Sequence, residues 1–178
     1  SKGVCKMKHT KNILKSLLIT VMALSLLAVS CSKDEGGTKN PVKPTPITIT
    51  ADAINGFLSF KDTVVGGFTI TTKTNPIDYK QAVEITVKNS SGSGNVKGND
   101  FKKAIESMPL SSLIDGANTV IEGTITPQTS GQTAMEVKLK VTPTSPNKFD
   151  TDVEKNAQAG ALTITLSFKP ENNDNWAQ

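Results

Sequence analysis

The sequence predicts a mainly β domain, either an antiparallel β-sandwich or a sheet of about seven strands with one short packed helix; an α+β fold is the alternative. Two observations carry this prediction. Apolar and polar residues alternate over several runs of the 178-residue chain, which is the period of half-buried strands. The polar positions of these runs are rich in Thr, and antiparallel sheets can leave one face in solvent.

The alternation is clearest in three runs, and the strongest strands are predicted over residues 83–88, 135–141 and 162–169. In the second of these, Val137 and Leu139 would face the core, whereas Glu136 and Lys138 would face solvent. Weaker strands are predicted over residues 47–51, 57–60, 67–73 and 119–126.

One helix is predicted over residues 99–108. Phe101 and Ile105 share one face at helical spacing, and Asn99 could cap the first turn. Residues 150–159 fit either a second short helix or a long loop.

The N-terminal part of the chain has the pattern of a bacterial export signal. A basic head precedes an apolar run over residues 17–29; the head contains Lys8, Lys11 and Lys15. A transmembrane helix would need about 20 apolar residues, whereas export signals have an apolar core of roughly 7–15. The sequence therefore predicts a signal peptide over residues 1–30, with Met7 as the true start.

Cys31 follows this apolar run directly. The segment Leu27-Ala28-Val29-Ser30-Cys31 resembles the lipobox of bacterial lipoproteins. The resemblance implies cleavage before Cys31 and attachment of a diacylglycerol to its thiol, which would make the membrane a partner through the lipidated Cys31.

The next residues are Ser32-Lys33-Asp34-Glu35. Lys33, Asp34 and Glu35 resemble the acidic export signal of surface-exposed Bacteroidetes lipoproteins. This resemblance implies a cell outer membrane location facing the exterior. The periplasmic face is the alternative, in which case these charges only begin a solvated linker.

A tether connects the expected anchor to the folded part. Pro41, Pro44 and Pro46 lie among Gly, Thr, Lys and Asn, a composition that favours extended backbone. At about 3.1 Å per residue the tether would reach roughly 45 Å. We therefore expect residues 31–46 to form a lipidated tether and residues 47–178 a single β-rich domain.

Removal of the signal peptide changes the charge of the protein. Five lysines and the only His, His9, precede Cys31, whereas all 16 acidic residues follow it. The mature chain keeps 15 lysines against 16 acidic residues, a side-chain charge of −1. The basic character of the full chain thus belongs to the signal peptide, and no nucleic-acid partner is predicted.

The mature chain offers little for catalysis. Without His or a free Cys it has no Ser-His-Asp or Cys-His site, and we expect no metal and no cofactor. Glu84 and Glu136 lie at outward strand positions beside Lys, where a solvated surface charge is the simpler interpretation. An enzyme would instead require two buried carboxylates within about 10 Å in a cleft.

Two further features bear on ligands and modification. Asp62-Thr63-Val64 resembles the short O-glycosylation motif of exported Bacteroidetes proteins, which implies a glycan on Thr63. Tyr79 and Trp176 are the only amphipathic aromatic residues of the mature chain, so a sugar-stacking platform would have to use them.

These observations predict a lipid-anchored cell-envelope protein that acts as a binding, adhesion or envelope-assembly module, with an unidentified protein or glycan partner. A structural coat antigen without a ligand is the alternative. A carboxylate-dependent enzyme acting on glycans is disfavoured.

Overall fold

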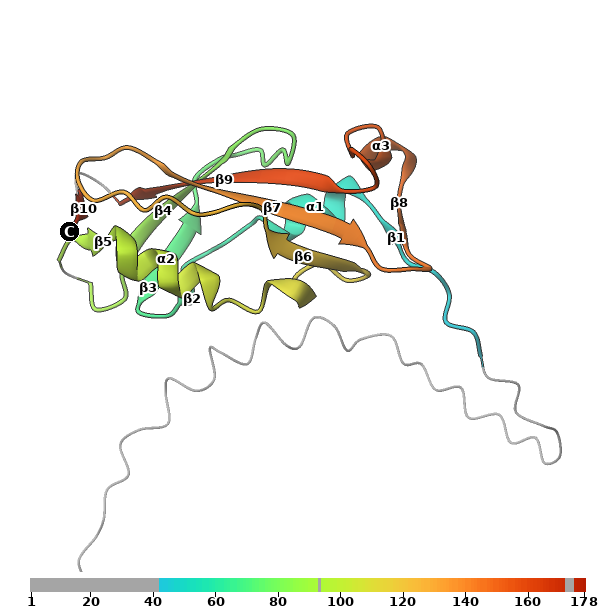
Figure 1. The fold of residues 1–178 in the computed structure, drawn as a ribbon, viewed down its shortest axis with the longest axis horizontal. Coiled ribbons are helices and arrows are strands. Elements are labelled where there is room, and N and C mark those ends of the chain that lie inside the picture. Colours follow the sequence, from blue (N-terminus) through green and yellow to red (C-terminus); the bar gives the residue numbers. More distant parts are fainter. Residues whose placement is uncertain (1–41, 93, 172–174) are drawn as a thin grey trace, which may run out of the picture. The chain divides into compact units, whose positions relative to one another are not determined.

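A six-stranded sheet in the order β2-β3-β4-β9-β7-β6 forms the framework of the protein (Figure 1). Its strands are β2 (Thr63–Val65), β3 (Phe68–Thr72), β4 (Val83–Asn89), β6 (Ala117–Ile121), β7 (Met135–Pro143) and β9 (Leu162–Pro170). The computed structural model describes residues 42–92, 94–171 and 175–178. The predicted signal peptide, Cys31 and the Lys33, Asp34 and Glu35 motif lie outside these residues.

The mainly β class is confirmed, and the sheet form with packed helices is the one observed. The strand pairing differs from the expectation in one respect. Neighbouring strands are antiparallel except for β4 and β9, which run parallel with Val83 opposite Leu166. A parallel pair needs a long crossover, and here the chain from β4 to β9 includes the helices α2 and α3 and two further strands of the sheet.

Two small parallel pairs lie outside the main sheet. β1 (Thr48–Ile49) pairs with β8 (Lys148–Phe149), and β5 (Val96–Lys97) pairs with β10 (Trp176–Ala177). Figure 1 shows them at opposite ends of the domain. The first pair holds the start of the described domain in place. Beside it, Asn147 Oδ1 accepts a hydrogen bond from the Ile47 amide at 2.9 Å.

The first helix, α1 (Ala51–Phe57), occupies part of a region where a strand was predicted. Thr50 caps it, since its hydroxyl accepts a hydrogen bond from the Ala53 amide at 3.2 Å. Ile54 and Leu58 are fully buried four residues apart. The strand prediction over 57–60 is therefore wrong, because these apolar residues follow the helical period.

The predicted helix near residue 100 is α2 (Gly98–Glu106), and it buries Phe101 and Ile105 as expected. Its N-cap is Lys97, without a side-chain bond, so the prediction that Asn99 caps the helix is wrong. A short 3₁₀ turn, η1 (Leu110–Ser112), follows it.

The helix alternative is correct for the segment after Phe149, although α3 (Thr151–Glu154) covers only its beginning. Asp150 caps this helix, with its carboxylate accepting a hydrogen bond from the Val153 amide at 2.8 Å.

The strand predicted over 119–126 ends early: β6 stops at Ile121, and the chain then leaves the sheet.

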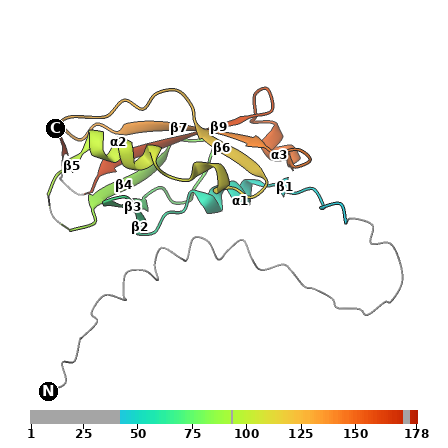
Figure 2. The same ribbon diagram turned by 60° about the horizontal axis from the view of Figure 1, so that its bottom comes forward.

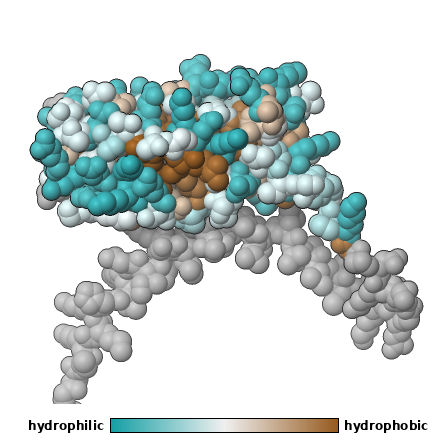
Figure 3. Space-filling model, in the orientation of Figure 1, coloured by the Kyte–Doolittle hydropathy of each residue, from teal (hydrophilic) through white to brown (hydrophobic). Residues whose placement is uncertain are grey.

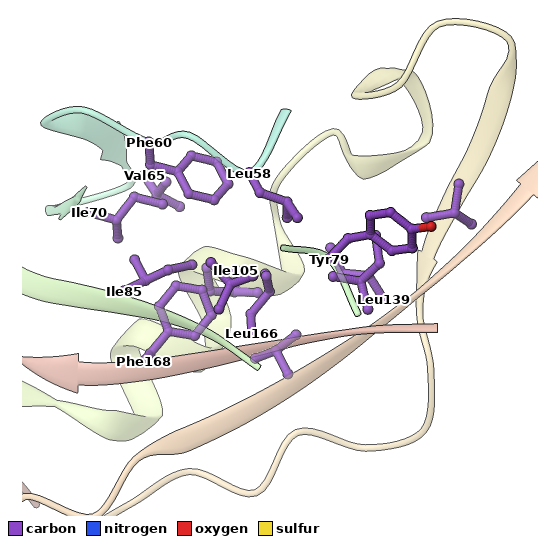
Figure 4. Packing of buried hydrophobic residues seen from close by; sticks show 14 of the residues in the cluster. Leu58, Phe60, Val65, Ile70, Tyr79, Ile85, Ile105, Leu139, Leu166 and Phe168 are labelled. Carbon is purple, nitrogen blue, oxygen red and sulfur yellow. The ribbon is translucent and has the colours of Figure 1, made fainter. Parts of the chain in front are cut away.

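The core lies between one face of the sheet and the helices. Figure 2 shows α1 and α2 across this face, and Figure 4 shows buried side chains of the sheet meeting those of α2. Phe101 makes edge contacts with Phe68 and Phe168, at ring-centroid distances of 5.4 and 5.0 Å. Burial of each such aromatic or aliphatic side chain stabilises the fold by about 1.5–3 kcal/mol.

In the part of the chain that the structure describes, every helix is too short or too polar to cross a membrane.

A candidate binding groove on the open face of the sheet

The second face of the sheet, opposite α1 and α2, carries polar and charged side chains. Strand β7 illustrates the division, because Glu136 and Lys138 are exposed while Val137 and Leu139 are buried. The alternation read from the sequence is therefore confirmed for this strand. α1 and α2 pack on the opposite face, so this open face is where a ligand could reach the sheet directly.

Three side chains form a row across the middle of the open face. Glu84 of β4 lies opposite Ser167 of β9, and Ser167 lies opposite Glu136 of β7. Neighbouring strands are about 4.8 Å apart, so the backbones of Glu84 and Glu136 are separated by roughly 10 Å. Both carboxylates are exposed. The sequence places each residue on a polar face but does not reveal that they are neighbours.

Ser167 is the least exposed member of the row. Only 9% of the residue is exposed, but its hydroxyl is not among the fully buried polar atoms, and it makes no hydrogen bond to another described residue. It lines a depression in the surface, so the hydroxyl remains available to a ligand.

Two depressions adjoin this row. The first, of about 540 Å³, lies over β3, β4 and β9; its lining includes Lys73, Glu84, Gln132, Ser167, Lys169 and Glu171. The second, of about 900 Å³, lies between the segment 122–134 and strands β7 and β9; its lining includes Glu122, Gln128, Thr133, Glu136, Lys138 and Thr163. We refer to these two depressions and the row Glu84, Ser167 and Glu136 as the polar groove.

Several charges of the polar groove are free of ion pairs. Within the described ranges no salt bridge involves Glu84, Glu136, Lys138 or Lys169. At one border of the groove, by contrast, Lys88 lies 3.7 Å from both Asp62 and Glu171. The free groups can therefore interact with a ligand without first breaking an internal pair.

The two candidate aromatic residues lie in the interior. Tyr79 and Trp176 are 4% and 2% exposed, and neither lines the polar groove. The Trp176 indole nitrogen donates a hydrogen bond to the Thr133 carbonyl at 2.8 Å, and the Asn156 amide donates to the Tyr79 hydroxyl at 3.3 Å. Neither ring is therefore available for stacking on a sugar.

An apolar area is also visible at the surface (Figure 3). A hollow lined only by apolar side chains lies between the helices and the sheet; Phe57, Ile105, Met108, Leu110 and Leu113 are among them. Its volume is about 10 Å³, which holds at most one water molecule. This hollow is a packing gap rather than a ligand site.

Thr63, the predicted O-glycosylation site, is the first residue of the edge strand β2 and is half-buried opposite Ile70. Its neighbour Asp62 has a positive φ of 45° and accepts a hydrogen bond from the Thr71 hydroxyl at 3.3 Å.

Among the residues described, no three His, Cys, Asp or Glu side chains are grouped as a metal site.

Comparison of the chain with protein families, with curated proteins and with solved structures gave no match.

Proposed function

We propose that this chain is a lipid-anchored cell-envelope protein of the outer membrane, facing the exterior, which binds a ligand through the polar groove. The lipobox resemblance at Cys31 and the acidic motif Lys33, Asp34 and Glu35 support the location. The arrangement of the sheet supports a binding role, because α1 and α2 cover one face and leave the polar groove on the other face open.

The observation that carries the binding role is the hydroxyl of Ser167. This hydroxyl makes no hydrogen bond to another residue of the described part of the protein, is not among its fully buried polar atoms, and lines a depression bordered by charges without an ion pair there. The polar groove is therefore the surface on which we place the ligand.

The anchor is tested by replacing Cys31 with Ala in the producing bacterium. We expect the protein to leave the membrane fraction and to lose labelling by a fatty-acid probe. Cys5→Ala is the matched control, because Cys5 is the only other cysteine and precedes the expected start at Met7. Unchanged membrane retention of Cys31→Ala would contradict the anchor.

Display on the exterior is tested by protease treatment of intact cells. We expect the wild-type domain to be degraded, and the double variant Asp34→Ala/Glu35→Ala to become protected because the export motif is removed. Protection of the wild type would place the domain on the periplasmic face.

The binding role is tested by capture with the full chain, purified in a zwitterionic detergent, from envelope extract and from spent medium. The wild type is compared with Lys138→Glu/Lys169→Glu, which reverses two charges of the groove. The matched control is Lys103→Glu, on α2 at the other face. A ligand retained by the wild type and the control but lost by the groove variant supports the proposal. Equal capture by all three would place the ligand outside the polar groove, and no capture by any would favour the coat antigen.

A further inference from the structure

We infer that the polar groove takes a neutral, hydroxyl-rich ligand, a carbohydrate chain, laid across β4, β9 and β7 over the row Glu84, Ser167 and Glu136. This inference rests on the proposed function, because it names the chemical class of the ligand bound at the same groove.

The hydrogen-bonding capacity of the row matches hydroxyl groups. The Ser167 hydroxyl can donate one hydrogen bond and accept others, and no described protein group uses this capacity. The carboxylates of Glu84 and Glu136 are acceptors on either side, and each has two oxygens that can receive adjacent hydroxyls. A ligand with closely spaced hydroxyl groups satisfies all three side chains at once.

The length of the row indicates a chain rather than a single sugar. Glu84 and Glu136 are two strand spacings apart, roughly 10 Å, which exceeds the width of one sugar ring. The two depressions continue the surface on both sides of the row. Threonine hydroxyls extend the same chemistry into both depressions; Thr71 and Thr86 line the first, and Thr124, Thr126, Thr133 and Thr163 line the second.

The charges of the groove disfavour a strongly charged ligand. Positive and negative side chains are interleaved and nearly balanced; they are Lys73, Lys138 and Lys169 with Glu84, Glu122, Glu136 and Glu171. A polyanion would meet the carboxylates of the row, and a polycation would meet the lysines beside it. A neutral ligand avoids both repulsions while still accepting charge-assisted hydrogen bonds.

The lining also disfavours a peptide. Peptide recognition normally relies on pockets that bury apolar anchor side chains. The large apolar residues that line the groove are Ile85, Ile125 and Val137, and all three point into the core. The groove therefore offers hydrogen bonds without an apolar anchor site.

The manner of binding sets the expected affinity. Tyr79 and Trp176 are buried, so no ring stacks on the ligand. The ligand would be held by hydrogen bonds to exposed side chains, for which water competes. We therefore expect dissociation constants of about 1 mM.

The test uses the full chain in a zwitterionic detergent and ligand-observed NMR. The probes are neutral hexasaccharides of glucose, mannose and xylose, with oligogalacturonate, oligolysine and a mixed-sequence decapeptide as charged and peptide comparisons. We expect at least one neutral saccharide to bind. We expect Ser167→Val and Glu84→Gln each to weaken it about ten-fold or more, since each removes hydrogen bonds to the ligand.

Ser111→Val and Glu106→Gln are the matched controls, on η1 and α2 at the helical face, and should leave binding unchanged. Because Val suits a strand, Ser167→Val should keep the fold, which the circular dichroism spectrum and thermal midpoint would verify. Glu84 is exposed, so Glu84→Gln tests the site without any change in the interior.

Other results would overturn the inference. Saccharide binding that survives both groove variants would place the ligand elsewhere. Binding of only a charged or peptide probe, or of none of the probes, would refute the neutral carbohydrate as the ligand class. The capture experiment with Lys138→Glu/Lys169→Glu makes no assumption about ligand class, so it judges the proposed function separately.

Discussion

Gly98, the first residue of α2, lies against the backbone carbonyl of Gln128 so closely that a β-carbon at this position would overlap with the carbonyl oxygen. Ala is normally the better helix former by about 1 kcal/mol. Here the backbone of segment 122–134 would have to move. We expect Gly98→Ala to destabilise the protein by about 1–3 kcal/mol in urea unfolding.

Gly56 of α1 provides the control for this prediction. A β-carbon there would have nothing within 4 Å. Gly56→Ala should therefore stabilise the protein by about 0.5–1 kcal/mol. The two substitutions are chemically identical, so equal effects would show that the contact between Gly98 and Gln128 has no energetic importance.

Trp176 connects the C-terminal strand to the core. Its ring lies 5.8 Å from that of Phe101, and its backbone amide donates to the Gly131 carbonyl at 2.8 Å. We expect Trp176→Ala to cost about 3–5 kcal/mol. Trp176→Phe keeps most of the packing but loses the bond to Thr133, and should cost less. Circular dichroism in urea measures both; similar losses for the two would contradict the role of the ring.

Thr119 of β6 has a buried hydroxyl without a hydrogen-bond partner among the described residues, and the residue is only 1% exposed. Val has nearly the same shape without the polar group. We expect Thr119→Val to stabilise the protein by about 1 kcal/mol or more, because an unsatisfied buried hydroxyl is removed. Thr142→Val, at an exposed position of β7, should change stability by less than about 0.5 kcal/mol. A destabilising Thr119→Val would reveal a partner for the hydroxyl.

Burial raises the pKa of Tyr79 above its ordinary value of 10.0; the hydrogen bond from Asn156 opposes this, and the charge of Asp150 adds to it. The folded state thus holds the proton more tightly than the unfolded chain. The resulting stability is present below about pH 10 and is lost as the pH rises through the folded pKa.

Because Tyr79 is the only Tyr, ultraviolet absorbance of the tyrosinate reports its titration alone. The midpoint should exceed 10.0 in the folded protein. Urea unfolding at increasing pH should show a smaller loss of stability for Tyr79→Phe than for the wild type. Parallel curves for the two proteins would assign the alkaline loss to the lysines.

The strands with strict alternation could be predicted from the sequence because each face of a strand has one environment. Val137 and Leu139 face the core and Glu136 faces solvent, as their spacing indicates. The strand expected over 57–60 failed because Ile54 and Leu58 are four residues apart, a spacing that puts two side chains on one face in a helix and in a strand alike. Only packing against the sheet decides between them.

The polar groove could not be predicted because it depends on the order of strands in the sheet. Glu84 and Ser167 are far apart in the chain and become neighbours through the parallel pairing of β4 with β9. Local alternation determines the face on which a side chain lies and carries no information about the partner strand. The low exposure of Ser167 likewise depends on the strands that lie on either side of it.

The β1–β8 pair has a mechanical consequence. A force applied through the N-terminal segment, directed along β1, acts first on the bonds from Lys148 N to Ile47 O at 3.1 Å and from Asp150 N to Ile49 O at 2.9 Å. Both lie across the direction of pull, so they are sheared together instead of opening one after the other. The bond between Ile47 and Asn147 shares the same load. A domain held in a flow by this end would resist unfolding at the point where the pull enters it.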